Sequence, residues 1–102
     1  MLQVFGRVKS RTFRVVWLLE ELKISYKLFE IDPRSDDAKK IYKNGKIPFI
    51  LEDGNLISDS VAILTYLSDK YKSFTEPPGT IKRAKQDAMT FRVLDEIEAI
   101  LW

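Results

Sequence analysis

The sequence contains neither cysteine nor histidine among its 102 residues. Without cysteine, the chain can form no disulfide, carry out no thiol redox chemistry of its own and offer no thiolate to a metal ion. Without histidine, it lacks the commonest general base and the commonest metal ligand. Any catalysis must therefore use hydroxyls, carboxylates, amines, backbone donors or a group that the substrate brings.

A strong charge of one sign and a long apolar run are also missing. The net charge is +2, and Lys and Arg are spread along the chain, which argues against a nucleic-acid partner. No apolar run approaches the length of a membrane span, and the start, MLQVFGRVKS, lacks the apolar region of a signal peptide. We therefore expect a soluble cytoplasmic protein with no membrane partner.

Apolar periodicity predicts strands and helices in a defined order. The expected elements are strands at 2–6, 25–32, 47–53 and 55–58, and helices at 10–24, 35–43, 60–71 and 81–102. The first strand, helix and strand form a βαβ unit, and Asp53-Gly54 is a strong hairpin signal between the last two strands. The order βαβ-α-ββα is that of a thioredoxin-like α/β domain with a mixed four-stranded sheet, here followed by one long helix.

The helix expected at 10–24 is strongly apolar. Its helical stripe consists of Val15, Leu18, Leu19 and Leu22. Phe13, Val16 and Trp17 widen this stripe, so the helix is predicted to be largely buried. Ser10 is a good candidate for its N-cap.

The C-terminal part of the sequence indicates a boundary. Residues 73–80 include Pro77-Pro78-Gly79, which cannot continue a helix, and are expected to link a domain at 1–72 to a helix at 81–102. That helix is apolar on two sides and stops at Trp102 without a capping signal, which suggests a fragment of a larger chain. We expect it to associate, either in a homo-oligomer or with further helices.

Three stretches together carry a family resemblance: GRVKSRTFRVVWLLEEL, NGKIPFILEDG and SDSVAILTYLSDKY. Over residues 2–71 the chain resembles the N-terminal domain of cytosolic glutathione transferases, of a serine-type, bacterial-like kind. Residues 81–102 resemble the first helix of that family's all-helical C-terminal domain, which is truncated here. The resemblance implies a homodimeric detoxification enzyme that uses glutathione, but no metal, and adds its thiolate to electrophilic small molecules.

The resemblance also implies a catalytic residue, Ser10. Its hydroxyl would donate a hydrogen bond to the glutathione sulfur and lower the thiol pKa from about 8.5. Phe5 has no hydroxyl and lies where tyrosine-type members carry their tyrosine. Thr12 is a second, weaker hydroxyl candidate, and Arg11 could add positive charge. The residue pattern alone favours Ser10 as a helix cap, whereas the resemblance favours the catalytic role.

The same resemblance implies how glutathione is bound. Pro48 would be cis, and the backbone of Ile47 would pair with glutathione like an added strand. Ser60 would hold the γ-glutamyl carboxylate at a helix N-terminus. Asp59 would face the α-amino group, although it is one methylene shorter than the family's Glu or Gln. Lys46 could pair with the glycyl carboxylate. The proline can also simply start a strand, which is compatible with the binding role. As alternatives, Asp59 and Ser60 cap a helix and the lysine is solvated.

Two functions from different classes are therefore open. The first is a glutathione transferase, or its glutathione-binding half. The second is a transferase-like module without catalysis that mediates binding or assembly. The presence of Ser10, Pro48 and Ser60 favours the enzyme.

Overall fold

A computed structural model describes residues 1–98 of the chain. The chain forms two compact units, Met1–Leu67 and a second that begins at Ser68. The boundary between them falls inside a helix, and each unit is described by itself. None of the helices in the described part of the chain combines the length and apolar character that crossing a bilayer requires.

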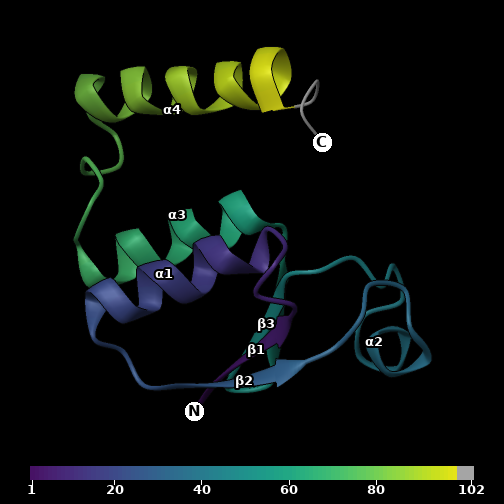
Figure 1. Ribbon diagram of the computed structural model, residues 1–102. Helices are drawn as coiled ribbons and strands as arrows, with labels where there is room; N and C mark the ends of the chain where they lie inside the picture. The colour runs from purple at the N-terminus through teal and green to yellow at the C-terminus, as the bar shows by residue number, and fades with distance from the viewer. Residues whose placement is uncertain (99–102) are drawn as a thin grey trace. The chain divides into compact units, whose positions relative to one another are not determined.

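The first unit contains a mixed four-stranded sheet (Figure 1). Its strands are β1 (Leu2–Gly6), β2 (Tyr26–Glu30), β3 (Phe49–Glu52) and β4 (Asn55–Ser58), in the spatial order β2-β1-β3-β4. The central strand β1 runs parallel to β2 and antiparallel to β3, and β3 pairs with β4 in a hairpin. The predicted fold class, with its mixed four-stranded sheet and its order of elements along the chain, is confirmed.

The hairpin turn forms at the predicted place. Asp53 and Gly54 both have positive φ angles, +50° and +81°. Two successive positive φ angles give the turn a twist that matches the strands on either side, and glycine adopts such an angle without strain. The turn therefore fixes the register in which β3 pairs with β4.

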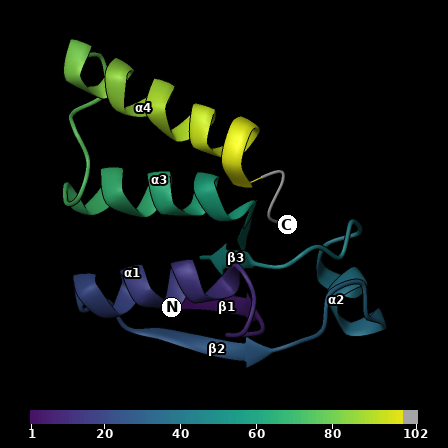
Figure 2. The ribbon, with the colours of Figure 1, turned by 45° about the horizontal axis from the view of Figure 1, so that its top comes forward.

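Two helices lie on one side of the strands, as Figures 1 and 2 show for α1 (Thr12–Leu22) and α3 (Ser60–Tyr71). Their buried apolar residues are Val15, Leu18, Leu19, Ile63 and Leu67. Val4 and Ile50 are paired across β1 and β3 and are fully buried. Because neighbouring residues of a strand point to opposite faces, Phe5 and Phe49 belong to the other face.

That second face carries a row of aromatic rings across three strands. Phe29, Phe5 and Phe49 are register partners, and both neighbouring pairs of rings stack with centroids 4.9 Å apart. Helix α2 (Asp36–Ile41) contributes Ala38 to the same cluster. The sheet is thus covered on both faces and buries its central strands.

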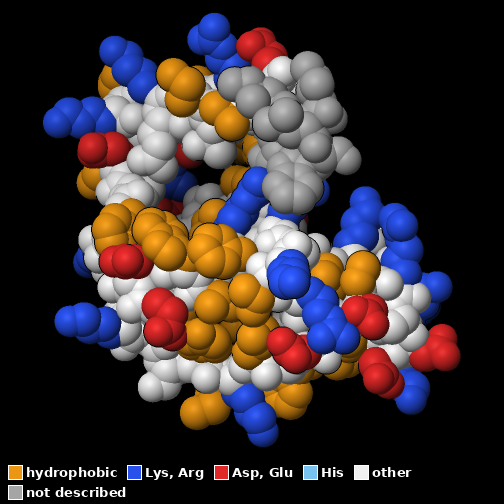
Figure 3. All heavy atoms as spheres, in the orientation of Figure 1, with side chains coloured by type: hydrophobic (Ala, Val, Ile, Leu, Met, Phe, Trp, Pro, Cys, Tyr) orange, Lys and Arg blue, Asp and Glu red, His pale blue; other side chains and the backbone are white. Residues whose placement is uncertain are grey.

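One prediction about α1 is wrong. Phe13 and Trp17 were expected to be buried, but their exposed fractions are 55% and 52%. The helix packs with the stripe formed by Val15, Leu18 and Leu19, and a helix in contact on one side leaves its opposite side in solvent. Figure 3 shows hydrophobic side chains gathered over α1 on the surface.

The second unit contains α4 (Ile81–Val93), which continues as a short π-helical segment, η1 (Leu94–Glu98). Thr80 caps α4 by accepting a hydrogen bond from the Arg83 amide at 3.1 Å. The buried guanidinium of Arg83 pairs with Asp69 at 2.8 Å and with Asp87 at 3.0 Å. The long predicted helix is therefore confirmed up to Glu98 with a change of helix type, and residues 99–102 of the prediction lie outside the described residues.

Candidate functional site

The strand register brings three predicted regions to one edge of the sheet. Phe5, near the end of β1, pairs with Phe49 at the start of β3, and Phe49 pairs with Ser58 at the end of β4. The loop that carries Ser10 follows β1, the Ile47–Pro48 bond precedes β3, and Asp59 follows β4. Segments that are far apart in the sequence therefore meet at the same end of three neighbouring strands.

Ser10 lies in the loop between β1 and α1. Its amide donates to the Arg7 carbonyl at 3.0 Å, and its hydroxyl hydrogen-bonds to the same carbonyl. Its Oγ also accepts the Thr12 amide at 3.2 Å and lies 2.9 Å from the Thr12 Oγ1. The predicted N-cap position is wrong, because α1 begins at Thr12 and Arg11 occupies the cap without a side-chain bond. Ser10 nevertheless satisfies one amide of the first turn.

The Ser10 loop is tied to the end of β2 by an ion pair. The Arg7 Nε donates to Asp32 at 2.8 Å, and a guanidinium nitrogen lies 3.6 Å from Glu30. The hydrogen bond from Arg7 holds the pKa of Asp32 below its ordinary value, and the same bond raises the pKa of Arg7. Arg7 therefore fixes the loop with its side chain while its carbonyl holds Ser10.

The lowered pKa of Asp32 predicts a pH dependence of stability. A carboxyl whose pKa is lower in the folded state stabilises the fold above its unfolded pKa of about 3.9, and that contribution is lost as the pH falls through the folded value. We expect Asp32→Asn to have a lower free energy of unfolding than the wild type at neutral pH. This difference should disappear as the pH falls into the acid range. Urea unfolding of both proteins along a pH series measures this.

The control for that series is Glu21→Gln, which removes an exposed carboxylate from the last turn of α1. We expect its stability to follow the wild type at every pH. A gap between wild type and Asp32→Asn that stays constant down to strongly acidic pH would contradict the role given to the ion pair.

The Ile47–Pro48 peptide bond is cis, as the resemblance implies. Pro48 is buried, and Ile47 packs against the aromatic cluster of the second face. The strand was expected to begin at Ile47, but its ladder begins at Phe49, so Ile47 precedes the paired residues. Lys46 is exposed next to this segment.

Asp59 and Ser60 begin α3. Asp59 has a positive φ of +76°, and its carboxylate accepts the Ala62 amide at 3.0 Å, which is an N-cap bond. The side chain of Ser60 is buried, and its Oγ accepts a hydrogen bond from the Arg14 guanidinium at 3.4 Å. The capping interpretation of Asp59 is therefore confirmed.

Arg14 is a residue that the sequence analysis missed. It joins α1 to the start of α3 across 46 positions of sequence. The available signal was its place in the first turn of α1, directly after the loop that carries Ser10. Arg14 places a positive charge beside the predicted carboxylate-binding serine.

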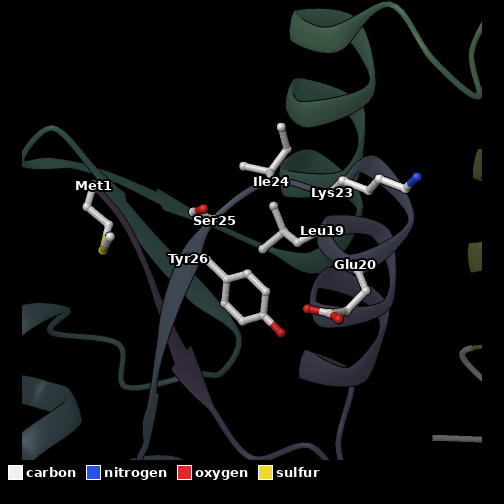
Figure 4. Close-up of a pocket in the computed structure, with 7 residues that line it drawn as sticks. All are labelled: Met1, Leu19, Glu20, Lys23, Ile24, Ser25 and Tyr26. Atoms are coloured by element: carbon white, nitrogen blue, oxygen red, sulfur yellow. The ribbon is translucent and has the colours of Figure 1, made fainter.

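The hollow drawn in Figure 4 lies at the other end of the sheet. It is lined by Met1, Leu19, Glu20, Lys23, Ile24, Ser25 and Tyr26, and Tyr26 pairs with Leu2 at the start of β1. Burial raises the pKa of Tyr26, and a hydrogen bond with Glu20 raises it further. The hollow contains none of the predicted site residues. Within residues 1–98, no group of three or more carboxylates is placed to hold a metal ion.

Comparison with known proteins gives consistent matches. A family model described as "Glutathione S-transferase, N-terminal domain" matches residues 9–78. A curated relative, glutathione S-transferase 3 of Schizosaccharomyces pombe, is 40% identical over 72 residues, which is 67% of this chain and 30% of the relative.

Solved structures give the same result for the fold. Glutathione S-transferase isozyme E7 of Drosophila melanogaster superposes with a TM-score of 0.77 at 28% identity, over 93% of this chain and 47% of that one. A theta-class enzyme of Xanthomonas axonopodis, solved with glutathione bound, superposes with a TM-score of 0.83 at 21% identity, over 97% of this chain and 51% of that one. The chain thus spans about a third of the length of its curated relative and half that of the solved structures.

Proposed function

Because the chain belongs to the glutathione S-transferase family, we propose that it is the glutathione-binding part of a serine-type transferase. Bound glutathione would be activated as a thiolate and added to electrophilic small molecules. The observation that supports the proposal is the shared sheet edge, since the segments that carry Ser10, Ile47 and Ser60 lie at the same end of three neighbouring strands. The finer placement among bacterial-like members stays a prediction.

The proposed roles are those that the family resemblance implies, and the arrangement of this edge is compatible with them. The Ser10 hydroxyl would turn from the Arg7 carbonyl to the sulfur and stabilise the thiolate. The backbone of Ile47, just outside the ladder, would pair with the peptide part of glutathione in the manner of an added strand. Lys46 would pair with the glycyl carboxylate.

The γ-glutamyl end would lie at the start of α3. Ser60 and the amides of the first turn would bind its carboxylate, and Arg14 would add a positive charge next to the hydroxyl. The carboxylate of Asp59 would meet the α-amino group while one of its oxygens continues to cap the helix. A carboxylate has enough acceptor capacity for both bonds.

The proposal extends to the whole protein that carries this chain. We propose a cytoplasmic homodimer with a role in detoxification, whose electrophile pocket is completed outside the chain. The exposed apolar residues Met89 and Phe91 of α4 support association. The alternative function is a binding or assembly module without catalysis. A module of that kind would need neither a poised Ser10 nor a bound electrophile.

Calorimetric titration of glutathione into the protein that carries this chain tests the proposal. We expect saturable binding, weakened roughly tenfold by Ser60→Ala, because a hydrogen bond to a carboxylate is lost. The matched control is Ser25→Ala at the opposite end of the sheet, which should bind as the wild type does. Absence of saturable binding would overturn the proposal, and binding without turnover of any electrophile would favour the module.

A further inference from the structure

Thr12 combines complete burial with a hydroxyl at the edge of the proposed site. Its side chain has an exposed fraction of 0%, although it is the first residue of α1. It lies against Gly6, where an added Cβ would be 2.1 Å from the Thr12 Oγ1. Since nothing larger than glycine fits there, the hydroxyl is held in a narrow space between β1 and the Ser10 loop. Such burial prevents a direct contact between Thr12 and a ligand.

The other hydrogen-bond partners of the Ser10 hydroxyl determine whether Thr12 donates to Ser10 or accepts from it. The Arg7 carbonyl can only accept, and the Thr12 amide can only donate. Ser10 has a single hydroxyl proton, and in this structure that hydroxyl donates its hydrogen bond to the Arg7 carbonyl. Because that one proton cannot also serve the 2.9 Å contact between the two hydroxyls, we assign the donor of this contact as Thr12 and the acceptor as Ser10. The Ser10 oxygen thereby accepts two bonds from one residue.

We infer that Thr12 is a positioning residue for Ser10, holding its oxygen with both its amide and its buried hydroxyl. The inference rests on the proposed function, in which Ser10 donates to the thiolate. An oxygen that accepts two hydrogen bonds is a stronger donor through its own proton, because hydrogen bonds in a chain polarise one another. The same two bonds hold the Ser10 oxygen in place. The hydroxyl can still rotate about its C–O bond, so its proton can turn from the Arg7 carbonyl to the sulfur.

A purely structural role for Thr12 makes a different prediction. A buried threonine that fills space would affect the stability of the fold but not the ionisation of a bound thiol. Thr12→Val keeps the branched shape and removes the hydroxyl, whereas Thr12→Ser keeps the hydroxyl and removes a methyl group. The pKa of bound glutathione therefore distinguishes the two roles.

The test measures that pKa from the ultraviolet absorbance of the bound thiolate along a pH series. We expect Thr12→Val to raise it by about half a unit and lower kcat with little change in KM, and Thr12→Ser to restore both. In a Ser10→Ala background, Thr12→Val should add no further rise. Should Thr12→Val fail to fold, Thr12→Ala removes the hydroxyl without adding a methyl group.

Two results would overturn this inference and leave the proposed function standing. One is a Thr12→Val protein whose thiol pKa equals that of the wild type while Ser10→Ala shifts it. The other is a Thr12→Ser protein shifted as far as Thr12→Val, which would assign the effect to packing of the methyl group. A wild-type protein that binds no glutathione would instead remove the proposed function, and this inference with it.

Discussion

Ser10→Ala is expected to reduce the rate of glutathione conjugation by roughly a hundredfold, the usual effect of removing one donor aimed at developing charge. The pKa of the bound thiol should rise toward the value of about 8.5 that a free thiol has. At neutral pH most bound glutathione would then be the unreactive thiol. Initial rates with an activated aryl halide, measured along a pH series, give both quantities.

The pH dependence separates this role from a structural one. Loss of the Ser10 hydroxyl also removes an acceptor for the Thr12 amide, which would destabilise the start of α1 at every pH. Loss of thiolate stabilisation is different, because raising the pH deprotonates the thiol and restores part of the rate. We therefore expect the deficit to shrink above pH 8.5 or so.

Ser25→Ala again serves as the control, since it removes a serine hydroxyl from the far end of the sheet. Its rate and pH profile should match those of the wild type. Unchanged conjugation by Ser10→Ala, with an unchanged pH profile, would show that another group activates the thiol. The transferase assignment would then survive only with a different catalytic residue.

The sequence predicted the elements that local patterns determine. Strand β4 and helix α3 have the predicted boundaries, because a two-residue turn and a polar cap mark their ends in the chain itself. The turn and the cap depend on a few neighbouring residues, so a single sequence is sufficient to locate them. The cis Ile47–Pro48 bond followed from the family resemblance.

Features that depend on distant segments were missed or misjudged. The hydrogen bond from Arg14 to Ser60 and the close approach of Thr12 to Gly6 exist because the sheet brings separate segments together. Periodicity indicated that α1 has an apolar side, but it could not say how much of that side the sheet covers. Trp17 was therefore placed in the core, although half of it is exposed.

Phe49→Ala is expected to cost about 3–5 kcal/mol of unfolding free energy, the usual range for truncating a fully buried aromatic residue. The Phe49 ring is fully buried between two neighbours. It stacks on Phe5 at 4.9 Å and meets the edge of Tyr42 at 5.6 Å. Its removal would leave a cavity beside Phe5, at the β3 end of the aromatic row, and the small first unit has little stability to spare. Urea unfolding followed by circular dichroism gives the midpoint and slope.

Phe13→Ala is the matched control, since the same side chain is removed from a position that is 55% exposed. We expect a loss below about 1 kcal/mol there, because little buried area disappears. Equal losses for Phe13 and Phe49 would mean that the exposed face of α1 is covered in the folded protein. A loss at Phe49 as small as that expected for Phe13 would show that the second face of the sheet does not depend on its aromatic row.

Because Phe49 directly follows Pro48, we also expect glutathione affinity to fall in Phe49→Ala at denaturant concentrations where the variant is still folded.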